Sequence, residues 1–116
     1  MMTAQEKPDM KTLNFFRAQF HEANKKWCPD EKIRLKMFVE EHFAYRLIDR
    51  FKPAISAATL LKEVMQWIDK NYCTLLFDNV VYGKRDYRIQ LKTGVAVFVL
   101  FNGTLRIRTC FIPGNE

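Results

Sequence analysis

One histidine and two arginines recur at intervals of four residues in the stretch Glu-Glu-His-Phe-Ala-Tyr-Arg-Leu-Ile-Asp-Arg-Phe. They are His42, Arg46 and Arg50, and a helix would place all three on one stripe of its surface. A histidine can exchange a proton near neutral pH. Two guanidiniums beside it could bind a phosphate through paired hydrogen bonds and stabilise a pentavalent phosphorane. The stripe is therefore a candidate site for acid–base chemistry at a phosphodiester.

A solvated helix face is the alternative interpretation of the same three residues. Arg46 and Arg50 could pair with Glu41, Asp49 or Glu63, and such exposed ion pairs contribute little to stability. The spacing alone does not separate a reactive stripe from an ordinary charged surface.

Positive charge is concentrated in the last third of the chain. The 116-residue sequence has a formal net charge of +6, and residues 80–112 hold six Lys and Arg against one Asp, a net +5. Basic side chains near exposed aromatic ones are a common footprint of nucleic-acid binding, whereas the alternative is the ordinary polar outer face of an antiparallel sheet. The predicted nucleic-acid contacts are Lys84, Arg85, Arg88, Arg106 and Arg108, with Tyr82 and Tyr87 flanking a Lys84-Arg85 turn and able to stack on bases.

Hydrophobic periodicity predicts the helices that would position these residues. Apolar residues at steps of three and four predict helices over residues 10–25, 40–51 and 57–70. Asp9 and Ser56 are suitable N-caps for the first and third of these helices, and Pro53 would end the second. Residues 32–39 alternate as in a short strand, although the same residues could continue a helix.

After Asn71, a plausible helix stop, the period changes to that of strands. Strands are predicted over residues 72–77, 86–91, 94–101 and 104–112. Asn102-Gly103 between two β-rich runs is a strong hairpin signal, and Lys92-Thr93-Gly94 predicts another tight turn. Two successive hairpins make an antiparallel meander. The fold class is therefore α+β, with N-terminal helices packed on one face of a C-terminal four-stranded antiparallel sheet.

Length and composition indicate one domain over residues 1–116, with the polar residues 1–8 frayed. No apolar run approaches the ~20 residues of a transmembrane helix, and no signal peptide is apparent. The three cysteines, Cys28, Cys73 and Cys110, are expected to be buried reduced thiols of a cytoplasmic protein. The histidines and cysteines lack ligand spacing, so neither a metal nor another cofactor is expected.

The helix with His-x-x-x-Arg-x-x-x-Arg, a following helix and a meander ending in Ile107-Arg108-Thr109 resemble a known group of small proteins. They are the RelE-like nucleases of the barnase–EndoU–colicin–RelE type, and the helix also resembles that of RegB-like phage endoribonucleases. The resemblance covers residues 33–112. It implies that His42 acts as acid or base, that Arg46 and Arg50 bind the scissile phosphate, and that Thr109 contacts it.

The chain departs from that pattern in two respects. Enzymes of the RegB-like and EndoU-like kinds use two histidines, whereas the second histidine here, His21, precedes the motif. Thr109 also alternates with Leu105 and Ile107, which places it on their face and not on that of the neighbouring arginines. A single histidine would have to work with Arg, Lys or Tyr.

The expected function is metal-independent RNA cleavage through attack of the 2′-hydroxyl on the adjacent phosphate. RNA is the expected partner, and an antitoxin or host protein is a further one. The alternative function is a non-catalytic nucleic-acid-binding or protein-inhibiting module of phage or prophage origin. A third interpretation is an interaction protein in which Phe15, Phe16 and Phe20 seal a dimer, and the sequence leaves the oligomeric state open.

Overall fold

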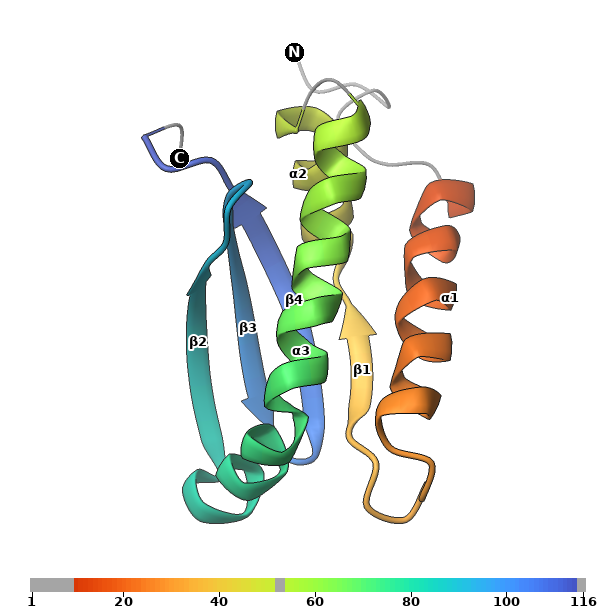
Figure 1. The fold of residues 1–116 in the computed structure, drawn as a ribbon, viewed down its shortest axis with the longest axis vertical. Coiled ribbons are helices and arrows are strands. Elements are labelled where there is room, and N and C mark those ends of the chain that lie inside the picture. Colours follow the sequence, from red (N-terminus) through yellow and green to blue (C-terminus); the bar gives the residue numbers. More distant parts are fainter. Residues whose placement is uncertain (1–9, 52–53, 115–116) are drawn as a thin grey trace.

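The computed structural model describes residues 10–51 and 54–114, and these form an α+β fold, which confirms the predicted class (Figure 1). The predicted fraying of residues 1–8 and the predicted roles of Asp9 and Pro53 concern positions outside the described residues. The elements in chain order are α1 (Met10–Trp27), β1 (Lys36–Val39), α2 (Glu41–Arg50), α3 (Ala54–Tyr82), β2 (Lys84–Gln90), β3 (Val95–Phe101) and β4 (Thr104–Phe111).

The sheet is mixed, with the strand order β1-β4-β3-β2. β2, β3 and β4 form the predicted antiparallel meander. β1 pairs in parallel with the first half of β4, so that Val39 lies opposite Ile107. The prediction of a purely antiparallel sheet is therefore wrong. Two helices and two strands, α2, α3, β2 and β3, separate β1 from β4 in the chain, and parallel pairing requires a long connection of this kind.

The predicted strand over residues 72–77 is also wrong, because α3 continues through it to Tyr82. Ile68, Tyr72 and Leu75 are all buried, at the three- and four-residue steps of a helix that packs one face on a core. Asn71 does not stop this helix, and its side-chain amide donates to the carbonyl of Trp67 one turn earlier. Gly83, with a positive φ of 71°, follows the last helical residue, as glycine often does.

Other boundaries differ by a few residues from the prediction. The predicted strand over residues 32–39 is present, but shorter, as β1. Ser56 lies inside the first turn of α3 and not at its cap. Phe16 and Phe20 are buried in the core of their own chain, whereas Phe15 is exposed. The interpretation that all three phenylalanines seal a dimer is therefore wrong.

The two faces of the sheet differ in character. On one face, alternate side chains of β3 and β4, among them Phe98, Leu105 and Ile107, enter the same core as the helices. In Figure 1, α3 crosses this face and α1 lies beside β1. The opposite face, here called the open face, is formed by Lys36, Phe38, Lys84, Asp86, Arg88, Gln90, Val95, Val97, Val99, Phe101, Thr104, Arg106, Arg108, Thr109 and Phe111.

A buried polar network holds the start of β1 in place. The side-chain amide of Asn24 on α1 donates to the Leu35 carbonyl at 2.7 Å. The Tyr72 hydroxyl on α3 donates to the Asn24 side-chain oxygen at 2.8 Å and accepts from the Leu35 N–H at 2.9 Å. Burial raises the pKa of Tyr72, which keeps the phenol in its neutral, donating form. The network thereby ties both long helices to the residue that precedes β1.

Candidate active site

The segment that carries the predicted motif is positioned by the end of β1. The backbone N–H of Glu40 donates to the Ile107 carbonyl at 3.1 Å, so the pairing with β4 extends one residue beyond the strand. α2 then lies against β4, with Phe43, Ala44 and Leu47 buried. This amphipathic packing turns the polar face of α2 away from the core.

His42 and Arg46 meet on the polar face of α2. His42 is exposed, and the Arg46 Nε–H points to its Nε2 at 3.4 Å. Since a guanidinium can only donate, His42 Nε2 acts as the acceptor and is the unprotonated ring nitrogen. Arg50, the third residue of the stripe, instead pairs with Asp49 at 2.9 Å, as the solvated-face interpretation predicts. The structure therefore brings together two members of the stripe and gives the third another partner.

Glu40 joins this helix to the arginines of β4. Its carboxylate lies 3.8 Å from Arg106 and 3.5 Å from Arg108. The residue occupies the N-cap position of α2 with an extended backbone, but its side chain makes no capping hydrogen bond. The sequence analysis missed Glu40. The available signal was a glutamate between a strand and a helix, at a position where Ser, Thr, Asp or Asn is usual.

These five residues, Glu40, His42, Arg46, Arg106 and Arg108, are called the α2–β4 cluster below. Neighbouring side chains partly desolvate the exposed ring of His42, and this is the largest cause that lowers its pKa. The charges of Arg46 and Arg108 lower the pKa further, whereas Glu40 opposes them. The lowered pKa favours the neutral imidazole at pH 7. Three guanidiniums against one carboxylate give the cluster a net charge of two positive charges. The cluster combines a neutral proton acceptor with an excess of anion-binding groups.

Thr109 lies on the open face, and the prediction that it shares the face of Leu105 and Ile107 is wrong. A β-bulge interrupts β4, because Phe98 pairs with Ile107 whereas the preceding Val97 pairs with Thr109. The extra residue, Arg108, shifts the alternation by one position. Thr109 is consequently half-exposed while the next residue, Cys110, is fully buried. The hydroxyl is thus directly adjacent in the chain to Arg108 of the cluster.

Cys110 lies beneath the cluster but is unsuited to nucleophilic chemistry. Its thiol contacts the Phe43 carbonyl at 3.8 Å, and burial raises its pKa to about 12. A thiol that stays protonated is a poor nucleophile. Cys28 is buried as well, whereas Cys73 is exposed on α3. The prediction of buried thiols is therefore wrong for Cys73, because the helix continues past Asn71 and turns this residue to solvent.

The remaining predicted nucleic-acid contacts fall on two sides of the sheet. Lys84 and Arg88 lie on the open face with Arg106 and Arg108, and Lys84 and Arg85 belong to β2 rather than to a turn. Tyr87 faces the helices, where its hydroxyl donates to Asp78 at 2.5 Å and its ring packs on Trp67. Arg85 lies on that side as well, 3.9 Å from Asp78 and over the rings of Tyr87 and the exposed Tyr82.

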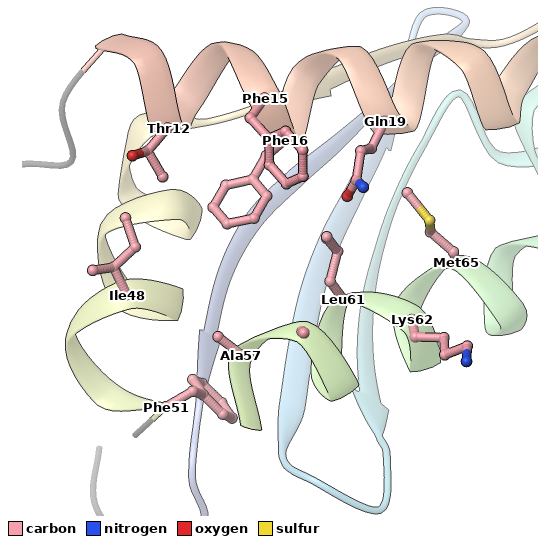
Figure 2. Close-up of a pocket in the computed structure, with 11 residues that line it drawn as sticks. Thr12, Phe15, Phe16, Gln19, Ile48, Phe51, Ala57, Leu61, Lys62 and Met65 are labelled. Atoms are coloured by element: carbon pink, nitrogen blue, oxygen red, sulfur yellow. The ribbon is translucent and has the colours of Figure 1, made fainter. Parts of the chain in front are cut away.

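A cavity of about 720 Å³ lies between α1, α2 and α3, away from the cluster. Figure 2 shows its lining, with Phe15, Phe16 and Leu61 around the space and Gln19 on α1 above it. The side-chain oxygen of Gln19 is buried without a hydrogen-bond partner. Lys62 is the single ionisable residue among those that line the cavity. An apolar space of this kind offers shape to a ligand but no pair of acid and base.

Over residues 10–51 and 54–114, no three His, Cys, Asp or Glu side chains are grouped so that they could hold a metal ion. In the same part of the chain, no helix has the length and apolar character to cross a membrane. Comparisons with protein-family models, with curated proteins and with solved structures find no match for this chain.

Proposed function

We propose that this protein is a metal-independent endoribonuclease of RelE-like fold and that the α2–β4 cluster is its active site. One observation carries the proposal: the exposed imidazole of His42 accepts from Arg46, in a cluster whose three guanidiniums are only partly balanced by a single carboxylate. The order helix, strand, helix, helix and meander, together with the His-x-x-x-Arg helix, supports the RelE-like assignment.

In the proposed reaction, His42 accepts the proton of the ribose 2′-hydroxyl. The 2′-oxygen then attacks the adjacent phosphorus, the bond to the 5′-oxygen breaks, and a 2′,3′-cyclic phosphate forms. Water protonates the leaving 5′-oxygen, because the cluster is open to solvent. A general base contributes about 10²–10⁴-fold to such a step. The lowered pKa of His42 suits this role, since it keeps the imidazole in the accepting form at neutral pH.

The arginines are proposed to stabilise the negative charge that develops on the phosphate. The phosphorane that forms during attack has one more negative charge than the diester, so guanidiniums that touch it stabilise the transition state more than the substrate. Arg46 and Arg108 are the arginines whose charges act on His42, and they are assigned to the reacting phosphate. Arg106, which shares Glu40 with Arg108, is assigned to the neighbouring backbone.

The test is cleavage of a labelled single-stranded RNA in EDTA, beside DNA of the same sequence. The parent is expected to cleave the RNA alone, because DNA lacks the 2′-hydroxyl. His42→Ala is expected to lose about 10²–10⁴-fold in rate. His21→Ala is the matched control, since His21 is an exposed histidine on α1, and it should cleave as the parent does. Equal rates for the two alanine variants would contradict the role of His42.

A non-catalytic nucleic-acid-binding module is the second candidate function. The observation that favours it is that the described cluster holds one histidine. Cleavage removes a proton from the attacking 2′-oxygen and adds one to the leaving 5′-oxygen, and two proton-transfer groups serve these steps best. In that case the guanidiniums would bind phosphates without reaction. RNA binding that weakens steeply with salt, with no cleavage in the parent, would favour this function.

A further inference from the structure

Two aromatic side chains of the open face lie at opposite ends of the basic strand β4. Phe38 is on the edge strand β1, beside Arg106 on β4, and is 39% exposed. Phe111 is the last residue of β4 and is half-exposed. The sequence analysis selected tyrosines and missed both phenylalanines, because their exposure depends on which face of the sheet the helices cover.

Each of these rings is stacked with a guanidinium. The Arg106 guanidinium lies 4.6 Å from the centroid of the Phe38 ring, and that of Arg17 lies 5.7 Å from it. The Arg88 guanidinium lies 4.6 Å from the centroid of the Phe111 ring. Nucleic-acid bases stack on aromatic rings and on guanidinium planes alike. Each pair therefore presents an aromatic ring and a guanidinium on which a base can stack.

Two valines of β3 lie on the open face between the two pairs. Val99 lies opposite Arg106 across the β3–β4 ladder, and Val97 lies opposite Thr109 and, on its other side, Arg88. Both valines face away from the helical core. Val97 is half-exposed, whereas Val99 is only 7% exposed. A nucleotide chain crossing this face would therefore meet Val97 together with the flanking rings and guanidiniums.

The charge of the open face matches a polyanion. Among its residues Asp86 is the single acid, against five bases that are Lys36, Lys84, Arg88, Arg106 and Arg108. Arg106 and Arg108 belong to the open face and to the α2–β4 cluster at once. A strand bound over the face therefore passes directly into the cluster.

We infer that the open face of the sheet is a stacking platform for single-stranded RNA, with the Phe38–Arg106 and Phe111–Arg88 pairs each taking a base. The inference rests on the proposed function, and it specifies the substrate as unpaired RNA. Bases can stack on protein side chains only when they are released from a duplex. The positive charges of the guanidiniums attract the phosphates, and each ring together with its guanidinium plane supplies affinity for bases of any sequence.

The Phe111–Arg88 pair allows a test outside the proposed active site. The probe is a labelled oligouridylate of about ten nucleotides, a length within the range of single-strand sites, bound to protein carrying His42→Ala so that it stays intact. Two substitutions are added to this background, one at a time. Phe111→Leu keeps an apolar side chain but removes the aromatic ring, and Arg88→Lys keeps the positive charge but removes the planar guanidinium. Each is expected to weaken binding about tenfold. Phe77→Leu, at an exposed phenylalanine of α3, is the control and should bind unchanged.

A second probe separates stacking from charge. It is the same oligonucleotide with abasic sites in place of its bases, which retains the phosphates. The background protein should bind this probe about a hundredfold more weakly than the oligouridylate, because both stacking contacts are lost. The two variants should then bind the abasic probe no worse than the background does. Arg88→Lys should leave the dependence of the oligouridylate affinity on salt unchanged, because the number of cations is the same.

The outcomes distinguish the platform from the nuclease. If Phe111→Leu and Arg88→Lys both bind the oligouridylate as tightly as the background, while their melting temperatures show that they are folded, the platform is overturned whether or not the parent cleaves RNA. If base-dependent binding is lost as expected but the parent cleaves no RNA, the platform stands and the nuclease proposal fails.

Discussion

The two ends of the short strand β1 carry polar groups of opposite kinds. At its start, the neutral side chains of Asn24 and Tyr72 are buried and bonded to each other and to Leu35. At its finish, Glu40 meets charged groups that are largely open to solvent, with the side chains of Arg106 and Arg108 49% and 55% exposed. Each side-chain nitrogen and oxygen of the first network has a hydrogen-bond partner, whereas the second network holds more positive than negative charge.

This difference separates polar groups that serve the fold from those that could serve chemistry. A buried polar group needs its partner, because an unsatisfied donor or acceptor costs about 1–3 kcal/mol. Exposed ion pairs contribute about 1 kcal/mol or less, so the fold does not require the three arginines of the cluster. The value of the second network lies in the anion that it can bind.

Tyr72→Phe is expected to produce the largest effect on the first network. It leaves the Leu35 N–H and the Asn24 side-chain oxygen without their partner, and should lower the free energy of unfolding by about 1–3 kcal/mol. Chemical denaturation measures this change. RNA cleavage below the melting temperature should stay at the parental rate, since Tyr72 lies outside the cluster.

The control for that loss is Tyr82→Phe, which removes the same atom from an exposed residue at the end of α3. It should change the free energy of unfolding by less than about 0.5 kcal/mol. Equal stability losses in the two variants would show that the buried network has no special role.

Glu40→Gln, at the other end of β1, should change RNA binding rather than the stability of the fold. The substitution releases Arg106 and Arg108 from their ion pairs, and RNA affinity should rise about two- to fivefold, the factor that corresponds to exposed pairs of this strength. The slope of affinity against salt should steepen as well, because more cations are free to contact phosphates. Fluorescence anisotropy at several salt concentrations measures both, and weaker binding would contradict the assignment of these arginines to phosphate.

The smallest expected effect is a change in the pKa of His42. An NMR titration measures it, with the ring signal of His21 recorded in the same spectra for comparison. Arg46→Gln removes a charge that lowers the pKa of His42, so this pKa should rise. Glu40→Gln removes a charge that raises it, so the pKa should fall. Because the general base must be unprotonated, the rate of RNA cleavage in the parent should rise with pH through a pKa below 6.5 and then level off. Shifts of the same sign in both variants would contradict the geometry of the cluster.

Local patterns predicted those parts of the molecule whose structure depends on neighbours in the chain. The β3–β4 hairpin follows from Asn102-Gly103, whose φ angles of 56° and 78° are both positive, as a type I′ turn requires. The helix with His42 and Arg46 follows from its apolar spacing. The β-like composition of residues 72–77 misled the prediction, because Tyr72 and Leu75 pack on a core that the sequence does not display.

In the candidate site, too, the sequence predicted the local contact but not the long-range ones. His42 and Arg46 are one helical turn apart, so their proximity is a local property. Glu40 reaches Arg106 and Arg108 only because β1 pairs in parallel with β4, a contact between residues more than sixty positions apart in the chain. The hydrophobic periodicity of the sequence does not predict which distant strands pair.

The sequence by itself determined the α+β class, the meander, the hairpin turn and the proximity of His42 and Arg46, because all of these arise from interactions within a few residues. The tertiary structure decided three further features: the partner of β1, the face of the sheet that stays open, and the side on which Thr109 lies. The last depends on one extra residue, Arg108, at the bulge. A single-residue shift in register moves every later side chain of a strand to the opposite face of the sheet. Only the pairing with Val97 and Phe98 shows where that shift occurs in β4.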